Sequence, residues 1–507
     1  MAEPKTFSSS EELKAAYQEG RLSIDRLLEI VDERIERDQR DSEKQQRTIK
    51  ALRAELDRLK QRLAQYEPEI RREATPANDA SSTTSAQYSL EAEEKRPRKR
   101  RKRNKSPGRK PTKIKFAEAE RFKDVYPEGV PRADCRLIRE RAVWRLEDGR
   151  AVRVGYRIFG VPGKKEGRIY GVTPRCEYGI EILVVLAFLV YVIGISLDKA
   201  CAVLQFFCKV PLSKLQADSL LRQLAKQWEG EFETLCNLIV QAAVVYVDET
   251  GWKIGSQGCS LWTFASELQR IFLFGCRKDL DTLEKMLPPD VFEGVAVSDD
   301  AAVYRHRFRF AQKCWAHLLR KAIRLALLYP RKKSYQRFLD ELLKLYRDAK
   351  RAASDGRLGS QGRARRVDEL EERLSELCQP YWRETTPDMK PHERDFANLV
   401  NELMERMDDA ELFTFVETPE VEPTNNLPER LQRDAAQDRK AARTSNTATG
   451  AHRRSVIASV LESLRANLSE FTLASVLIEV QSWMKEGISL FTRQWQEIEP
   501  PAVLDSG

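Results

Sequence analysis

Four short runs of β-branched and aromatic residues constrain the fold of this chain more than any other feature. They lie at 242–248, 260–266, 270–275 and 294–299, and turn-forming segments separate them. The first three are close enough in sequence to pair as an antiparallel meander, whereas a helical pattern, DLDTLEKML, separates the third from the fourth. A helix between two strands is typical of a crossover connection, so we expect an α/β core.

Two of these runs end in an aspartate, Asp248 after VVYV and Asp299 after VAV. Side chains at the ends of buried strands converge at one edge of a sheet, where polar chemistry begins. A buried carboxylate needs a compensating charge, and a divalent ion such as Mg²⁺ is one solution. Glu429, in the helix that begins TNNLPERLQR, offers a third carboxylate. The alternative from spacing alone is that both aspartates only cap the loops that follow them.

Helical patterns dominate the remainder of the chain after the first hundred residues. Within 177–240, the segment CKVPLS separates two helical stretches at a spacing typical of helix-turn-helix units, although two packed core helices leave the same pattern. Long charged helices are predicted over 315–412, and a further helical stretch over 424–465. Alternating apolar residues at 140–159, around Asp148-Gly149, predict a β-hairpin ahead of these helices.

Residues 24–66 carry a heptad pattern, with most steps of four and three residues ending on an apolar side chain. Such a seam must be covered by another helix, which predicts a coiled-coil dimer; a hairpin folded back on itself is the alternative. Asp38, Ser42 and Gln45 weaken the seam at its centre and can set its register.

The net charge of +9 comes from one short block. Residues 95–110 hold eleven Lys or Arg and no acid, so the remaining 491 residues sum to −2. One dense cationic segment on a near-neutral body is typical of a protein with a polyanion partner such as DNA. The block follows the heptads after a small, polar stretch at 68–94, so we interpret both as a flexible, disordered basic linker; the basic region of a bZIP protein would directly precede its zipper. The predicted DNA-binding residues are Arg96, Arg98, Lys99, Arg100, Arg101, Lys102, Arg103, Lys105, Arg109 and Lys110.

Secreted, membrane and disulfide-stapled proteins are set aside by three observations. The N-terminal residues are polar and lack the apolar region of a secretory signal. The most apolar run, 182–195, has 14 uncharged residues, fewer than the roughly 20 that a membrane span needs. Nine cysteines without a Cys-x-x-Cys pair favour reduced thiols. We therefore expect a cytoplasmic protein.

Five strings occur in order at wide spacing along the chain. They are VDETGW (247–252), SDDAAVY (298–304), CWAHLLRK (314–321), PTNNLPERLQR (423–433) and GAHRRSVIASVLESLR (450–465). Together they resemble the signature segments of the insertion sequence 66 family of bacterial DDE transposases, over roughly residues 105–465. The heptads, the basic linker and the hairpin also follow that family's usual order.

The resemblance implies an RNase H-like catalytic core with a mainly helical insertion between the second and third acids of a DDE triad. By their places in the matching strings, Asp248 is the first acid, Asp299 the second and Glu429 the third. Tyr304 then falls on the tyrosine of the family's D-x-x-x-x-Y pattern, which ranks Asp299 above Asp300. The three carboxylates would hold two Mg²⁺ ions about 4 Å apart, with Mn²⁺ as a substitute, for strand cleavage and strand transfer.

Other acids and a Cys-x-x-His motif lie near these positions. Glu249 follows Asp248 on a strand, so its side chain should point to the opposite face of the sheet. Glu422 precedes the helix of Glu429 and is a weaker candidate. Cys314 and His317 could be half of a zinc site, but without a second pair nearby we interpret them as structural packing or a hydrogen bond near the active site.

One stretch departs from the family pattern. The family usually carries a cysteine-rich zinc module ahead of its catalytic domain, whereas this chain has only the isolated Cys135 and Cys176 there. Two cysteines cannot supply a four-ligand zinc site, so we expect a metal-free hairpin module in its place.

The predicted function is a metal-dependent DNA transposase that binds the terminal inverted repeats of its own insertion sequence. The alternatives are a catalytically silent DNA-binding protein derived from a transposase and an RNase H-fold nuclease without strand transfer. Predicted partners are double-stranded DNA, a second copy through 24–66 and small accessory proteins of the same element, at the bacterial nucleoid and away from membranes. The expected domains are a coiled coil (1–67), a basic linker (68–112), a hairpin module (113–175), a helical helix-turn-helix-like region (176–240), the first part of the core (241–330), a helical insertion (331–412), the second part of the core (413–465) and a helical tail (466–507).

Overall fold

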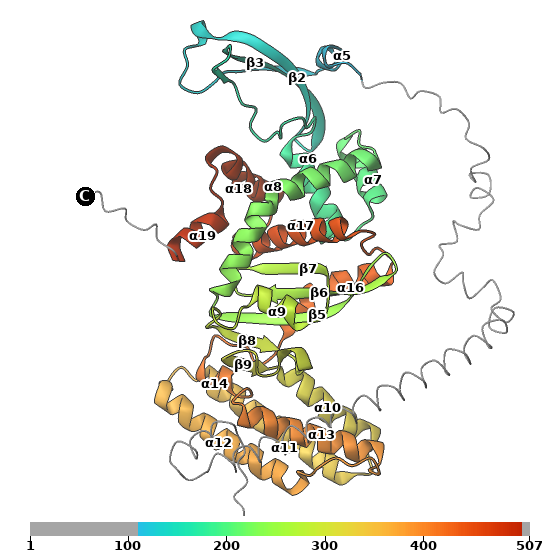
Figure 1. The fold of residues 1–507 in the computed structure, drawn as a ribbon, viewed down its shortest axis with the longest axis vertical. Helices are drawn as coiled ribbons and strands as arrows, with labels where there is room; N and C mark the ends of the chain where they lie inside the picture. The colour runs from blue at the N-terminus through green and yellow to red at the C-terminus, as the bar shows by residue number, and fades with distance from the viewer. Residues whose placement is uncertain (1–109, 499–507) are drawn as a thin grey trace, which may run out of the picture. The chain divides into compact units, whose positions relative to one another are not determined.

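A mixed five-stranded sheet carries two of the predicted acids in the computed structural model, which describes residues 110–498 (Figure 1). Its strands are β5 (Val244–Ile254), β6 (Gln257–Ala265), β7 (Arg270–Cys276), β8 (Val295–Ser298) and β9 (Phe310–Lys313), in the order β7-β6-β5-β8-β9. The first three strands pair antiparallel, and β8 pairs in parallel with both β5 and β9. Helix α9 (Leu280–Met286) lies in the connection between β7 and β8. The predicted meander and crossover are both present.

The sheet differs from the prediction at two strands. Strand β5 continues to Ile254, so Asp248 lies in the middle of a strand and not at its end, which corrects the expected position. Strand β9 was not predicted, because its buried residues include the polar Gln312 and Lys313. Their polar atoms are satisfied from elsewhere in the chain: the Gln312 amide donates to the Leu412 carbonyl at 3.0 Å, and Lys313 lies 3.7 Å from Glu411.

Helix α17 (Ala448–Asn467) covers the edge strand β7 with a row of serines. The hydroxyl oxygens of Ser455, Ser459 and Ser463 accept the backbone N–H groups of Phe274, Phe272 and Arg270, each at 2.9 Å. Residues four apart share one face of a helix, so the row matches alternate N–H groups of the strand. The edge donors of β7 are therefore satisfied by a helix and not by another strand.

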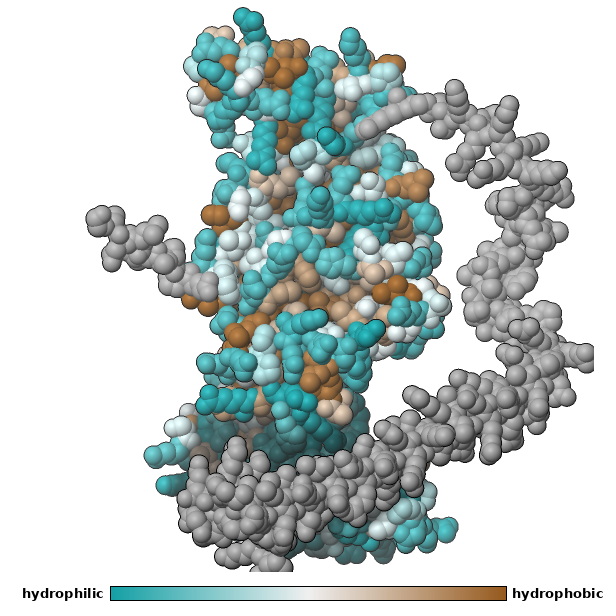
Figure 2. All heavy atoms as spheres, in the orientation of Figure 1, coloured by the Kyte–Doolittle hydropathy of each residue, from teal (hydrophilic) through white to brown (hydrophobic). Residues whose placement is uncertain are grey.

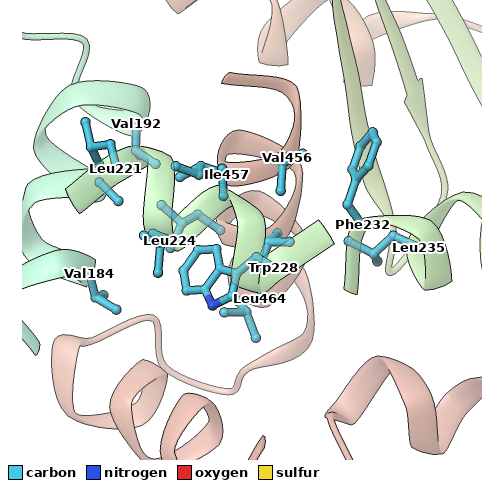
Figure 3. Packing of buried hydrophobic residues seen from close by; sticks show 14 of the residues in the cluster. Val184, Val192, Leu221, Leu224, Trp228, Phe232, Leu235, Val456, Ile457 and Leu464 are labelled. Atoms are coloured by element: carbon cyan, nitrogen blue, oxygen red, sulfur yellow. The ribbon is translucent and has the colours of Figure 1, made fainter. Parts of the chain in front are cut away.

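A large hydrophobic core joins this side of the sheet to helices from both ends of the described chain. In Figure 3, Leu224, Trp228 and Leu235 lie near Val456, Ile457 and Leu464. The helices are α6 (Ile180–Ala187), the π-helix η3 (Phe188–Val192), α7 (Leu197–Cys208), α8 (Lys214–Val240), α18 (Leu473–Glu486) and α19 (Leu490–Ile498), together with α17. Half of the apolar run 182–195 is buried here and all but one of its other residues are half-buried, as expected of a core helix. None of the helices within residues 110–498 is long and apolar enough to cross a membrane.

The predicted hairpin is present as part of a small second sheet. A turn at Asp148 (φ 49°) and Gly149 (φ 75°) joins its two long strands, as two-residue primed turns require. The sheet consists of β1 (Arg121–Val125), β2 (Arg136–Glu147), β3 (Arg150–Val161) and β4 (Lys165–Glu166), flanked by α5 (Thr112–Ala117) and η2 (Arg132–Asp134). Cys135 and Cys176 are both free thiols.

A helical region with its own hydrophobic cluster follows β9, as predicted from its charged helical pattern (Figure 1). It comprises α10 (Trp315–Leu328), α11 (Lys333–Ser354), α12 (Ser360–Cys378), η5 (Gln379–Tyr381), α13 (Pro391–Asp408) and α14 (Thr414–Glu417). The cluster reaches the sheet at Tyr246, Val295 and Val297. On the face shown in Figure 2, hydrophobic side chains form small patches among hydrophilic ones. The heptads at 24–66 and the stretch 68–94 lie outside the described residues.

Candidate active site

The first predicted acid lies where strand β5 loses its parallel neighbour. Pairing between β5 and β8 ends at Tyr246 and Val297, whereas pairing with β6 continues as far as Ile254. Asp248 is two residues beyond the last β8 pair, so one side of its strand is open at that point. Asp299 follows the end of β8 directly. The two aspartates therefore belong to the same edge of the parallel pair.

The loop after β8 is anchored to β5 through Tyr304, the last residue of η4 (Ala302–Tyr304). Tyr304 is fully buried, and its hydroxyl donates to the carboxylate of Glu249. Burial, followed by the negative charge of Glu249, raises the pKa of Tyr304 well above its ordinary value. Within the loop, the Asp299 carboxylate accepts the Ala301 N–H at 2.9 Å. These contacts fix the position of Asp299 relative to β5.

Asp248 and Glu249 pair with different residues of β6. Asp248 lies opposite Thr263, and Glu249 lies opposite Trp262. The Glu249 carboxylate also forms an ion pair with Lys278. The opposite orientation predicted for Glu249 follows from the alternation of residues along a strand and stays a prediction.

The third acid is brought to the sheet by the segment that precedes its helix, α15 (Asn426–Leu431). Buried Asn425 donates its side-chain amide to the Val247 carbonyl at 2.7 Å, directly beside Asp248. Its backbone N–H meets the Cys314 sulfur at 3.2 Å, and the Trp315 N–H donates to the Pro423 carbonyl at 3.0 Å. Four residues after Asn425, Glu429 lies on the first turn of α15.

The far end of α15 is also fixed to the sheet. Gln432 follows the helix, and its side-chain amide donates to the Thr263 hydroxyl at 3.2 Å. Thr263 is the residue that pairs with Asp248 across the two strands. Contacts at both ends of α15 thus place Glu429 on the same side of the sheet as Asp248. The next helix, α16 (Arg433–Lys440), continues along β5.

The pKa of Asp248 responds to the charges of the other acids. Burial, followed by the charges of Glu249, Asp299 and Glu429, raises the pKa of Asp248 to about 7. All three predicted catalytic acids therefore lie within one electrostatic neighbourhood, although 130 residues of chain separate the second from the third. The alternative in which the aspartates cap loops agrees with Asp299, whose carboxylate accepts the Ala301 N–H, whereas Asp248 lies inside strand β5.

Two exposed cations flank the acids. Arg320 lies 3.3 Å from the Glu429 carboxylate, and its side chain is 55% exposed. Lys278 pairs with Glu249 and is 50% exposed; burial lowers the pKa of Lys278, but Glu249, Asp299 and Asp248 outweigh it and raise the pKa. Sequence reasoning gave neither residue a role. Arg320 lies within the matching string 314–321, whereas no sequence pattern points to Lys278.

Asp300, the second choice for the middle acid, forms ion pairs with two arginines. Its carboxylate lies 2.9 Å from the Arg406 guanidinium and 3.2 Å from Arg305. Arg406 is fully buried in α13 and also pairs with Asp409 and Glu411. Asp300 therefore links the sheet to the helical region, which supports the ranking of Asp299 above it.

The remaining predicted residues fall into two groups. Lys110 pairs with Glu118 at 2.8 Å. The other predicted DNA-binding residues, Arg96, Arg98, Lys99, Arg100, Arg101, Lys102, Arg103, Lys105 and Arg109, lie outside the described residues. Glu422 is exposed, and only its backbone N–H is fixed, by donation to the Tyr246 hydroxyl at 3.0 Å.

Within residues 110–498, two groups of side chains are spaced to hold a metal ion through Cys, His or carboxylate atoms. One is Cys314, His317 and Glu429, and the other is His306, Glu405 and Asp409. Neither group includes Asp248 or Asp299, so Glu429 is the one predicted triad acid that belongs to either of them. The Asp248, Asp299 and Glu429 carboxylates offer only oxygen atoms, the donor type that Mg²⁺ prefers.

Two comparisons with known proteins complete this picture. A search of curated proteins finds no match. The family model described as Transposase IS66 family matches residues 175–453, which is more than half of the chain and includes all three acids. The chain therefore belongs to the IS66 family of transposases.

Proposed function

We propose that this transposase cleaves and joins DNA at the terminal inverted repeats of its own element through a DDE triad of Asp248, Asp299 and Glu429. The five-stranded sheet would be an RNase H-like core, and 331–412 its helical insertion. Support comes from the sheet order β7-β6-β5-β8-β9, which sets the two aspartate-bearing strands side by side. The proposal is carried by the attachment of the Asp299 loop and the Glu429 helix to the strands beside Asp248, where both acids act on the Asp248 charge.

The chemistry of these acids suits a divalent cation. Three carboxylates brought together raise the cost of ionising Asp248, and a doubly charged ion would offset that cost. We propose that Asp248, Asp299 and Glu429 hold Mg²⁺, with Mn²⁺ as a substitute. When bound, the metal would activate a water or hydroxyl oxygen and stabilise the leaving oxygen.

The chain's own residues would orient the acids and receive the DNA. Asn425 and Gln432 hold the helix of Glu429 against β5 and β6, and Tyr304 holds the loop of Asp299. Lys278 and Arg320 are half exposed beside the acids, but each is paired with a carboxylate, so they would reach DNA phosphates only by leaving Glu249 and Glu429. The basic block at 95–110 would add phosphate contacts without reading sequence.

The proposed reaction has two steps, strand cleavage and strand transfer. In cleavage, water attacks a phosphodiester at the element end, a new P–O bond forms, and the old P–O bond breaks to leave a 3′-hydroxyl. In strand transfer, that 3′-hydroxyl attacks a phosphodiester of the target, and a target 3′-hydroxyl leaves. A dimer through 24–66 would bring two element ends together at the bacterial nucleoid.

The test is strand cleavage of end-containing DNA with Mg²⁺ by Asp248→Asn and Glu429→Gln. We expect both variants to lose activity by at least about 100-fold, because each removes a charged ligand. Glu422→Gln is the matched control and should stay active, since Glu422 is exposed and absent from the charges that act on Asp248. Full activity in either triad variant would refute the assignment. A joined product from a 3′-hydroxyl donor would exclude a nuclease that only cuts.

A further inference from the structure

Cys314, His317 and Glu429 form a cluster whose chemistry differs from that of the three acids. One donor atom from each, a sulfur, a ring nitrogen and a carboxylate oxygen, lie within 4.8 Å of one another. Zn²⁺ takes this mixed donor set at about 2.0–2.3 Å, which needs the donors roughly 3.5 Å apart. We propose that these residues form a second metal site, for a borderline ion of the Zn²⁺ class, which shares Glu429 with the Mg²⁺ site.

The sulfur is the fixed member of this cluster. Cys314 is 1% exposed and lies at the N-cap of α10, and its sulfur accepts the Asn425 N–H at 3.2 Å. This contact fixes the position of the sulfur, the donor atom that selects a borderline or soft metal. The Cys-x-x-His spacing on this helix places His317 on the same face, one turn further along.

The other two ligands have room to adjust. His317 is 33% exposed and Glu429 is 30% exposed, and His317 Nε2 lies 3.8 Å from a Glu429 oxygen. Both side chains are partly exposed, so an ion could reach their donor atoms, although it would have to displace Arg320 from Glu429. His317 Nδ1 is buried without a hydrogen-bond partner, so the ring is not committed to another contact. With three protein ligands, the fourth position would be open to water.

The shared carboxylate couples this site to the proposed active site, so this part of the inference rests on the proposed function. An ion bound by Cys314 and His317 would hold Glu429 toward α10 and withdraw it from Asp248 and Asp299. By thermodynamic reciprocity, Mg²⁺ at the acids would weaken the second site by the same factor. Zn²⁺ would therefore act as an inhibitor of a Mg²⁺-loaded transposase.

The experiment is a Co²⁺ titration of the reduced full-length protein, followed by absorption spectroscopy without DNA. Co²⁺ replaces Zn²⁺ and reports its ligands directly, because thiolate coordination gives a charge-transfer band and four-coordinate geometry gives intense visible bands. We expect one thiolate-bound Co²⁺ per chain with both features. Cys314→Ser should abolish the thiolate band, and His317→Asn, at a partly exposed position, should weaken Co²⁺ binding by about tenfold or more.

Matched variants make the outcome decisive. Cys135→Ser should keep the thiolate band, since Cys135 lies in neither metal-spaced group. Binding at His306, Glu405 and Asp409 would give no such band, because that group has no sulfur. No thiolate band in the wild-type protein, or a band that survives Cys314→Ser, would overturn the proposal. Neither result depends on DNA cleavage, so failure of the second site and failure of the DDE assignment remain distinguishable.

Discussion

Ionisation of Asp248 costs free energy in the folded chain. Its pKa rises from 3.8 to about 7, first through burial and then through the charges of Glu249, Asp299 and Glu429. A carboxyl with a raised pKa in the folded state stabilises the fold fully only below its unfolded pKa of 3.8, and this contribution is lost as the pH rises through about 7. Above neutral pH, Asp248 is charged in the metal-free protein, and the fold therefore carries the full free-energy cost of this ionisation.

We predict that Asp248→Asn stabilises the metal-free protein above neutral pH. At about pH 8 the gain in the free energy of unfolding should be about 2–4 kcal/mol, because one pKa unit corresponds to about 1.4 kcal/mol. At about pH 5 the gain should be smaller, since the wild-type carboxyl is then mostly protonated. Urea denaturation in a chelator at both pH values measures this difference, with Glu422→Gln as the control. An equal gain at both pH values would contradict the assigned cause.

Single residues also show how far the sequence could be interpreted. The resemblance to a known family selected Asp248, Asp299 and Glu429, and Tyr304 separated Asp299 from its neighbour Asp300. The partner of Asp300 is Arg406, which lies on a helix more than a hundred residues later, so no local pattern could identify it. Lys278 is beyond prediction for the same reason, since only the folded sheet brings it to Glu249.

At the scale of elements, the contact between α17 and β7 is the least expected feature. Helix α17 is mostly buried, yet it carries three polar residues, Ser455, Ser459 and Ser463. From sequence periodicity alone, this pattern indicates only a weakly amphipathic helix. Their spacing of four residues is explained by the neighbouring strand β7, whose backbone N–H groups donate to the three hydroxyls. The predicted meander and crossover needed only local patterns, whereas β9 and this contact depend on tertiary partners.

We predict that Ser459→Ala destabilises the protein although it removes only one oxygen atom. Ser459 is fully buried, and the substitution leaves the Phe272 N–H without its acceptor inside the core. An unsatisfied buried donor costs about 1–3 kcal/mol, which urea denaturation can resolve. The control is Ser219→Ala on the exposed face of α8, which should change stability by less than about 0.5 kcal/mol. Equal stabilities for the two variants would show that the serine row does not support the sheet edge.

At the scale of the whole molecule, charge is divided unevenly between the described chain and the segment before it. The block at 95–110 holds eleven cations and no acid, while in the described part many cations are already paired with acids, as Lys110 is with Glu118 and Lys321 with Glu402. Paired cations attract phosphate weakly, because their field is largely cancelled at short range. The dominant electrostatic contribution to DNA binding should therefore come from the block and not from the sheet or the helical region.

We predict that replacing the six cations at 98–103 with serine lowers DNA affinity mainly at low salt. Each phosphate contact contributes a slope of about −0.9 to the dependence of log K on log salt, so the loss should flatten this slope by up to about 5. Replacing Arg331, Lys332 and Lys333, an exposed run in the helical region, is the matched control and should leave the slope nearly unchanged. Because phosphate contacts carry no sequence information, end-containing and random DNA should lose affinity equally. An unchanged slope in the 98–103 variant would show that these six cations do not carry the electrostatic contribution to DNA binding.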